Sequence, residues 1–329
     1  MKALIGLTYD LRDDHIAQGL PPEQAAEFDS RQTIDLLEGA IRSLGYRTDR
    51  VGHARTLAAR LVAGDRWDLV FNIAEGLRGR SRESQVPCLL ELYDIPYTFS
   101  DPLVCAATLD KAVAKQLVRA AGLYTADYHL VSQASDCQNV DLGYPLFAKP
   151  LAEGTSKGIN KRSRIDSPVQ LAAVCRQLLE DFRQPVLVEE YLPGREFTAA
   201  LLGTGADARV LGIMEVRLRN GEELIYSYET KERCEELIAY RRAGDDPIAS
   251  DLEKLALSAY RALQMRDAGR VDIRCDRAGR PCFVEANPLP GLHPTHSDLP
   301  MIAAQEGMDY PTLIDSIITS AYSRNGACP

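Results

Sequence analysis

A hairpin near the end of the chain carries carboxylates in a pattern that suits a metal ion. If residues 277–280 form a four-residue loop, antiparallel pairing places Asp272 opposite Glu285 and Arg270 opposite Asn287. Strand side chains alternate with a period of two, so these four residues share one face and two carboxylates meet there. Like charges that face each other destabilise a hairpin by up to about 1 kcal/mol unless a positive charge lies between them.

A divalent cation would supply that charge. Carboxylate and amide oxygens are hard donors, and Mg²⁺ characteristically takes one or two carboxylates together with phosphate oxygens of a substrate. The alternative is a solvent-exposed polar face neutralised by Arg270 and Arg274, which is the commoner case for an arbitrary hairpin. The opposite face is predicted to be apolar, with Val271, Ile273, Val284 and Ala286. The pairing also places Cys275 near Cys282.

Two lysines and a glycine-rich loop could hold phosphate. Lys149 ends a predicted buried strand, where a charge is costly unless an anion meets it, and Lys111 follows an aspartate. In loop 153–158 the glycines let backbone N–H groups approach an oxyanion, and Thr155 and Ser156 add hydroxyl donors. Most such loops are only turns. The chain lacks a P-loop and has no G-x-G-x-x-G after its first strand, which removes the two commonest nucleotide motifs.

A third segment could recognise a nucleoside. The apolar strand 186–192 ends in Glu189 and Glu190 before a Pro-Gly turn, and Glu196 follows the turn. Edge backbone groups of this strand could face a purine, with Glu196 on the ribose hydroxyls. Taken alone, Glu189 and Glu190 are better explained as solvated charges at the end of a strand.

The first hundred residues alternate between strands and helices. Strands are predicted at 3–8, 47–51 and 67–74, with helices between them. A polar loop with Asp13 and Asp14 follows the first strand. This alternation predicts an open parallel sheet with helices on both faces, whose ligand edge lies beyond the carboxyl ends of the strands. Asp10 and the segment 75–83 belong at that edge.

The rest of the chain is predicted to mix helices and strands. The helices are expected at 106–121, 167–182 and 251–264, and the strands at 144–150, 186–192, 197–202, 210–216 and in the hairpin 270–285.

The composition is that of an ordinary globular protein. The chain has 329 residues, 45% hydrophobic and 26% charged, with a net charge of -9. This acidity argues against nucleic acid or an anionic membrane surface as the main partner. No apolar run approaches the roughly 20 residues that span a bilayer, and the eight cysteines show no paired metal-ligand spacing. We therefore expect a cytoplasmic protein of two domains or three small lobes.

Six ordered motifs together resemble the ATP-grasp superfamily, and within it the D-alanine–D-alanine ligase-like branch. They are Asp-Lys at 110–111, Ala-Lys-Pro at 148–150, Glu-Gly-Thr-Ser-Lys-Gly at 153–158, Val-Glu-Glu-Tyr-Leu-Pro-Gly-Arg-Glu-Phe at 188–197, Gly-Arg-Val-Asp at 269–272 and Val-Glu-Ala-Asn-Pro at 284–288. The resemblance implies an α/β chain with an ATP-grasp fold and an N-terminal open parallel-sheet domain. It divides the chain into domains at 1–105, 106–192 and 193–329, and family habit favours a homodimer.

The resemblance also assigns roles to residues. It gives ATP the residues Lys111, Lys149, Thr155, Ser156, Glu189, Glu190, Leu192, Glu196 and Lys231, and the metal the residues Asp272, Glu285 and Asn287. Two Mg²⁺ ions are implied, with Mn²⁺ as an alternative. Arg270 would stabilise a tetrahedral intermediate, with Thr155 and Lys231 also in catalytic positions. The implied reaction forms an acyl phosphate from a carboxylate and ATP, and an amine then displaces phosphate.

The chain departs from this family at substrate positions. Glu75 stands where D-alanine ligases carry histidine, and Glu232 where they carry an aromatic residue after the loop lysine. Glu27 matches the contact for the first substrate's amino group, and Lys157 adds a charge to the serine loop. Near the second substrate's carboxylate, the chain places His296 and Ser297.

We therefore expect an amino-acid ligase with an altered substrate, in specialised biosynthesis, whose site is closed by the charged segment 219–246. The alternatives are the D-alanine–D-alanine ligase of peptidoglycan synthesis and a catalytically silent nucleotide-binding module. The magnesium ligands and Arg270 speak against the silent module.

Overall fold

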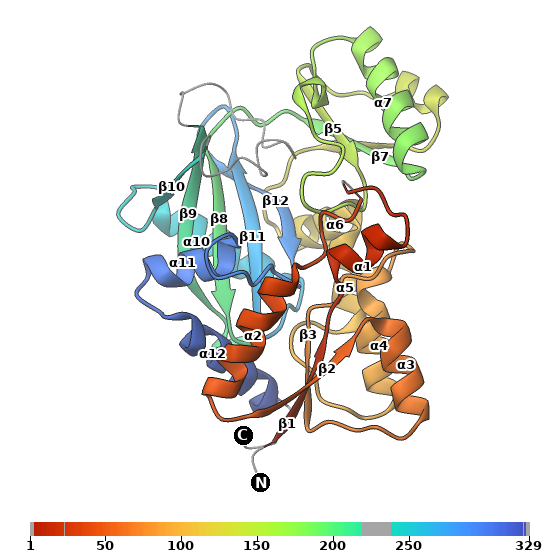
Figure 1. Ribbon diagram of the computed structural model, residues 1–329. Coiled ribbons are helices and arrows are strands. Elements are labelled where there is room, and N and C mark those ends of the chain that lie inside the picture. The colour runs from red at the N-terminus through yellow and green to blue at the C-terminus, as the bar shows by residue number, and fades with distance from the viewer. Residues whose placement is uncertain (1–2, 23, 219–237, 325, 327–329) are drawn as a thin grey trace.

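Three sheets organise the chain in the computed structural model, which describes residues 3–22, 24–218, 238–324 and 326. Figure 1 shows the N-terminal sheet at the lower right, the central sheet at the top and the C-terminal sheet at the left. Within the described residues, no helix is long and apolar enough to cross a membrane.

The N-terminal sheet follows the predicted alternation. Its strands run parallel in the order β2-β1-β3. The elements are β1 (Leu4–Thr8), β2 (Arg47–Gly52), β3 (Leu69–Asn72), α2 (Arg31–Ser43), α3 (Ala54–Val62), η1 (Arg82–Ser84) and α4 (Gln85–Leu92). Helix α2 packs on one face with residues of β1 and β3, and α3 and α4 share a core on the other. The prediction of an open parallel sheet with helices on both faces is confirmed.

Two predicted segments differ from the structure. The polar stretch around Asp13 contains a short helix, α1 (Arg12–Ala17). The single helix predicted over 106–121 is two helices, α5 (Pro102–Leu109) and α6 (Lys111–Ala120). Asp110 separates them, because its extended backbone ends α5 and its carboxylate caps α6 by accepting the first free N–H groups of that helix. Lys111 is therefore the first residue of α6.

The central sheet is antiparallel, in the order β4-β7-β5-β6. Its elements are β4 (Tyr128–Val131), η2 (Ala134–Asn139), β5 (Leu146–Pro150), η3 (Lys161–Ser163), β6 (Arg164–Ile165), α7 (Pro168–Phe182) and β7 (Val186–Glu190). Helix α7 covers this sheet through a small apolar core. The sequence predicted β5, α7 and β7, whereas β4 and β6 are too short to give a periodic signal.

The C-terminal sheet is antiparallel, in the order β10-β9-β8-β11-β12. Its elements are β8 (Glu196–Leu202), η4 (Gly205–Asp207), β9 (Arg209–Leu218), β10 (Ile238–Arg242), α10 (Ala249–Ala262), β11 (Ala268–Cys275), β12 (Pro281–Asn287), α11 (Asp298–Gln305) and α12 (Tyr310–Arg324). Helix α10 packs on one face. Helices α11 and α12 pack on the other, in a core shared with β1 and α2 of the N-terminal sheet.

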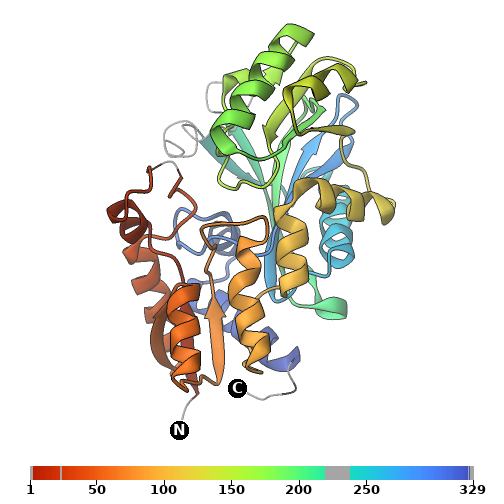
Figure 2. The same cartoon turned by 90° about the vertical axis from the view of Figure 1, so that its right-hand side faces the viewer.

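The three sheets fall inside the ranges 1–105, 106–192 and 193–329, although the first boundary cuts helix α5. We propose these ranges as the domains. In the second view the green helix α7 of the central part stands at the top and the red to orange N-terminal elements lie at the lower left (Figure 2).

The β11–β12 hairpin confirms the predicted pairing where chemistry is expected and corrects it toward the loop. Asp272 pairs with Glu285 and Arg270 with Asn287, as predicted. The register then shifts by one residue, so Ile273 pairs with Phe283. This irregularity turns Val284 into the cleft beside Glu285 and gives its predicted place in the apolar core to Phe283.

The same shift changes the hairpin end. Cys282 pairs with Arg274, and Cys275 pairs with Pro281. The predicted opposition of the two thiols is therefore wrong by one position, and the loop spans 276–280 in place of 277–280.

Candidate active site

A cleft between the central and C-terminal sheets gathers many residues predicted to bind nucleotide or metal. β5 and β7 line one wall, and β8, β11 and β12 the other. The predicted residues in its lining are Lys149, Ser156, Glu189, Glu190, Leu192, Glu196, Arg270, Asp272 and Glu285. Segments far apart in the sequence therefore meet at one place.

Asp272 and Glu285 face each other in this cleft, and each has a cation beside it. Arg270 donates through Nε and Nη2 to the two oxygens of Asp272, at 3.0 and 3.1 Å. Nζ of Lys111 lies 3.4 Å from Oε2 of Glu285. The pair is therefore part of the cleft wall and does not form the solvated face of the alternative interpretation. Arg274 pairs with Glu196, at 3.2 Å.

The donor set suits a hard divalent cation. Asp272 and Glu285 contribute carboxylate oxygens, and Oδ1 of Asn287 accepts the Leu289 N–H at 3.2 Å while keeping a second lone pair. Among the described residues, no cluster of three or more His, Cys, Asp or Glu side chains forms a complete metal site. Two carboxylates and an amide that share an ion with substrate phosphate are the arrangement Mg²⁺ favours.

A buried carboxylate holds two lysines at the inner end of the cleft. Oε1 of Glu189 lies 2.8 Å from Nζ of Lys149, and Oε2 lies 2.7 Å from Nζ of Lys115. Burial alone would raise the pKa of Glu189, but the two ammonium groups outweigh it and lower the pKa to about 2. Burial lowers the pKa of Lys115. Glu189 thus acts as a counter-ion inside the protein.

The sequence prediction missed Lys115, which is fully buried. A signal was present, because Lys115 lies one turn after Lys111 on the same face of α6.

Near Glu190, Leu192 and Glu196, the cleft is lined by two aromatic rings and a guanidinium group. Tyr191 stacks on Phe147 with ring centroids 6.2 Å apart, and its hydroxyl accepts from Nη2 of Arg274 at 3.3 Å. Glu190 is exposed at the end of β7. Planar groups of this kind suit the face of a flat ligand.

The glycine-rich loop borders the cleft in a strained conformation. Ser156 lines the cleft, and Lys111 donates through Nζ to the carbonyl oxygen of Glu153 at 2.6 Å. Thr155 and Ser156 both have positive φ, at 50° and 54°. Non-glycine residues rarely adopt this region, and such conformations concentrate at functional sites.

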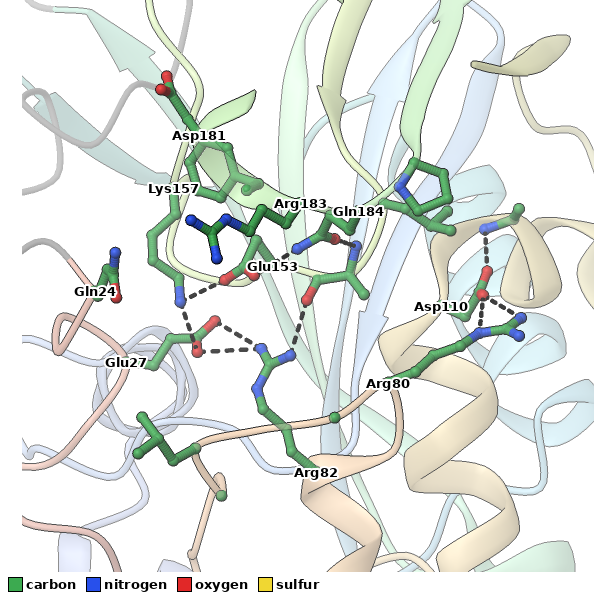
Figure 3. A pocket seen from close by; sticks show the side chains of 18 of the residues that line it. Gln24, Glu27, Arg80, Arg82, Asp110, Glu153, Lys157, Asp181, Arg183 and Gln184 are labelled. Carbon is green, nitrogen blue, oxygen red and sulfur yellow. Dashed lines mark hydrogen bonds and ion pairs between the residues drawn. The ribbon is translucent and has the colours of Figure 1, made fainter. Parts of the chain in front are cut away.

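A second and larger cavity lies on the other side of this loop (Figure 3). Glu27, Arg82, Glu153 and Lys157 line it as one ion network. Nζ of Lys157 lies 3.0 Å from Oε2 of Glu27, and Nη2 of Arg82 donates to both Glu27 oxygens, at 3.2 and 3.1 Å. Burial would raise the pKa of Glu27, but Arg82, Lys157 and a backbone N–H outweigh it and lower the pKa.

Glu75 lies at the predicted edge of the N-terminal sheet. The N–H of Gly76 donates to Asp10 at 2.9 Å, which confirms that Asp10 and segment 75–83 meet there. Burial and the nearby charges of Glu83 and Glu27 hold the pKa of Glu75 well above its usual range. Burial likewise raises the pKa of Glu83 to about 7. Neither carboxyl lines the cleft between the central and C-terminal sheets or the larger cavity.

Residues around the start of α11 form the other end of the cleft. The Ser297 hydroxyl accepts the His293 N–H at 3.0 Å, and the rings of His293 and His296 lie 4.5 Å apart. Ser297 and His296 are not among the residues that line the cleft, whereas Asp298 is. Asp298 accepts from Nη1 of Arg270 at 2.8 Å. The sequence prediction missed this contact, because nothing local links the two residues.

Lys231 and Glu232 lie outside the described residues, as does much of the segment 219–246 predicted to close the site. The described part of that segment contains β10 and Asp246, which Arg195 holds through two hydrogen bonds of 3.1 and 2.6 Å. Closure of the site by this segment stays a prediction.

Comparison of the sequence with known proteins finds the same family that the six motifs resemble. The family model described as "D-ala D-ala ligase C-terminus" matches residues 117–319. A D-alanine–D-alanine ligase from Bordetella petrii is 35% identical over 81% of this chain and 79% of its own. An uncharacterised protein from Sinorhizobium fredii is 34% identical over 78% of this chain and 75% of its own.

Solved structures share the fold. The D-alanine–D-alanine ligase from Bacillus anthracis complexed with ATP superposes with a TM-score of 0.77 at 21% identity, covering 99% of both chains. The VanG D-Ala:D-Ser ligase from Enterococcus faecalis gives 0.74 at 20% identity, covering 98% of this chain and 100% of its own. The ATP-grasp fold with an N-terminal parallel sheet is thus confirmed.

Proposed function

The chain belongs to the D-alanine–D-alanine ligase family of ATP-grasp enzymes, and we propose that it joins a carboxylate to an amine with a substrate pair other than two D-alanines. Membership in the family makes it an ATP-dependent ligase that forms C–N bonds. The identity of the two substrates and the role of each site residue are our proposal. We further propose that it acts in the cytoplasm, as the composition predicts. A homodimer and a role in specialised biosynthesis are proposed from the family resemblance alone.

The cleft supplies the groups that a phosphoryl transfer requires. Lys111 and Lys149 would neutralise the ATP phosphates, and Ser156 lies at the loop beside them. Arg270 would stabilise the oxyanion of the tetrahedral intermediate. Asp272, Glu285 and Asn287 would hold Mg²⁺, which when bound neutralises charge on the phosphate oxygens.

The proposed reaction has two steps. A carboxylate oxygen of the first substrate attacks the γ-phosphorus of ATP, the bond to the ADP oxygen breaks, and an acyl phosphate forms. The amine of the second substrate then attacks the carbonyl carbon and loses a proton, and inorganic phosphate leaves. Lys231 would approach the terminal phosphate, as the family resemblance implies.

The saturation of Glu27 carries the proposal of an altered substrate. An ionised carboxylate has about four acceptor positions. Arg82 uses one on each oxygen, Lys157 uses one at 3.0 Å, and the N–H of Gly154 uses one at 2.5 Å. The ammonium of an amino acid such as D-alanine would have to displace one of them.

The neighbourhood of Glu75 supports the same conclusion. D-Alanine ligases carry histidine where this chain has Glu75, and burial together with the nearby charges of Glu83 and Glu27 holds the pKa of this carboxyl well above its usual range. The position that the family resemblance assigns to the first substrate therefore differs in side-chain chemistry from that of a D-alanine ligase.

A substrate panel tests this function directly. Release of ADP and phosphate is measured with D-alanine alone and then with paired amino acids and other carboxylates. We expect faster turnover with at least one pair than with D-alanine. Dipeptide formation from D-alanine as the best substrate would restore the peptidoglycan alternative. ATP binding without acceptor-dependent turnover across the panel would favour a silent nucleotide-binding module.

A further inference from the structure

A buried ion network links the N-terminal part of the chain to the glycine-rich loop (Figure 3). Glu27 precedes α2 and Arg82 lies in η1, whereas Glu153 and Lys157 belong to the loop after β5. The side chains of Glu27, Arg82 and Lys157 are each 7% exposed. Lys157 also pairs with Glu153, at 2.5 Å. Two cations and two carboxylates thus balance within one buried cluster.

Contacts hold the backbone of this loop at successive residues. Nη1 of Arg82 donates to the carbonyl of Ala152 at 2.9 Å, and the N–H of Ala152 donates to Gln184 at 2.7 Å. Lys111 donates to the carbonyl of Glu153 at 2.6 Å, and the N–H of Gly154 donates to Oε1 of Glu27 at 2.5 Å. The loop is therefore fixed from its start to the residue before Thr155.

Glu27 brackets the two strained residues of the loop. It binds the backbone of Gly154, directly before Thr155, and the side chain of Lys157, directly after Ser156. Conformations such as those of Thr155 and Ser156 persist only where their surroundings hold them. A Cβ at position 154 would meet Oε1 of Glu27 at 2.5 Å, so this approach also requires glycine.

We propose that Glu27, Lys157 and Arg82 are positioning residues, through which the N-terminal part of the chain fixes loop 153–158 and so presets Ser156 toward the nucleotide phosphates. The loop separates the two cavities, with Ser156 on the cleft side and Lys157 on the side of the larger cavity. Without the cluster, the loop must regain its strained form each time a triphosphate binds. The inference rests on the proposed function only in placing ATP in the cleft.

Lys157→Met is the variant that tests this role, because it keeps the aliphatic stem and removes the charge. The affinity for ATP with Mg²⁺ is measured by calorimetry, and the affinity for adenosine by ligand-observed NMR. We expect ATP affinity to fall about tenfold, as for a loop that must be ordered on binding, and adenosine affinity to stay within about twofold. Lys157→Arg should restore most of the ATP affinity.

Lys254→Met is the matched control. It makes the same substitution on α10, where Lys254 pairs with Asp251 at 3.6 Å and the two side chains are 74% and 67% exposed. Exposed pairs contribute little, so both affinities should remain those of the wild type. Equal losses of ATP and adenosine affinity in Lys157→Met, or no loss of either, would overturn the positioning role.

Hydrogen exchange gives a readout that needs neither nucleotide nor substrate. In the wild type, the Gly154 amide should be protected by its bond to Glu27, and both Lys157→Met and Glu27→Gln should speed exchange in the peptide spanning 152–158. Unchanged exchange in folded Lys157→Met would also overturn the inference. Failure of the substrate panel, by contrast, leaves both binding and exchange readouts intact, so the two proposals fail separately.

Discussion

The facing carboxylates Asp272 and Glu285 give the sharpest expectation at the scale of single residues. Asp272→Ala or Glu285→Ala removes one donor and leaves the strand pairing, which depends on backbone groups. We expect ATP-dependent turnover to fall by about a hundredfold or more, because changes even behind metal ligands cost up to that much. ADP release measured across a Mg²⁺ titration checks this.

Glu253→Gln is a suitable control for this pair, since it removes one carboxylate charge from an exposed position of α10. Its turnover should equal that of the wild type. A wild-type rate in Asp272→Ala or in Glu285→Ala would remove the metal assignment.

Glu83 predicts how stability depends on pH. Its pKa rises from the ordinary 4.5 to about 7 in the folded protein because burial disfavours the charged form. The unfolded chain therefore loses this proton at lower pH than the folded one, so stability declines as pH rises from about 4.5 to 7. The full penalty at pH 8 is ~3 kcal/mol, at 1.36 kcal/mol per pKa unit.

Glu83→Gln should remove this penalty. We expect the variant to gain unfolding free energy relative to the wild type at pH 8. It should gain little at pH 4.5, where the folded wild type holds the proton and the unfolded chain still holds about half of it. Urea unfolding at the two pH values measures the difference. An equal change at both would show that Glu83 ionises normally.

At the scale of elements, the sequence predicts what repeats locally. The apolar spacing of α2, the alternation in the N-terminal sheet and the hairpin pairing of Asp272 with Glu285 are all readable, because each depends on neighbours in the chain. The one-residue shift near Ile273 is not readable. It depends on Phe283 filling the apolar core beneath α10, which is a tertiary contact between separate segments of the chain.

One missed feature of the site has a local signal in the sequence. The break between α5 and α6 at Asp110 could have been found, since aspartate is a favoured N-cap. Other features have no local signal. The contacts of Asp298 with Arg270 and of Glu27 with Lys157 join residues 28 and 130 positions apart. No periodicity encodes such pairs, so only folding reveals them.

At the scale of the whole molecule, Asp267 joins the N-terminal and C-terminal parts. It is fully buried and accepts the Phe99 N–H at 2.8 Å, Nη2 of Arg324 at 3.0 Å and the Ser320 hydroxyl at 2.9 Å. Arg324, the last residue of α12, also donates to the carbonyls of Tyr97 and Phe99. One carboxylate thus ties the segment before α5 to the final helix.

Asp267→Ala should therefore weaken the attachment of the N-terminal sheet. The change leaves the mostly buried guanidinium of Arg324 without its carboxylate and the Phe99 N–H without its acceptor, which costs about 3–5 kcal/mol. It also places alanine at a φ of 62°. Trp67, the only tryptophan, lies in the core beside the N-terminal sheet and reports on it by fluorescence, while far-UV circular dichroism reports on the whole chain. In urea the two transitions should coincide in the wild type and separate in the variant.

Ser320→Ala removes a single bond to the same carboxylate and should cost only about 1 kcal/mol, with coincident transitions. A loss in Asp267→Ala no larger than that of Ser320→Ala would mean that the shared apolar core alone holds the two parts together.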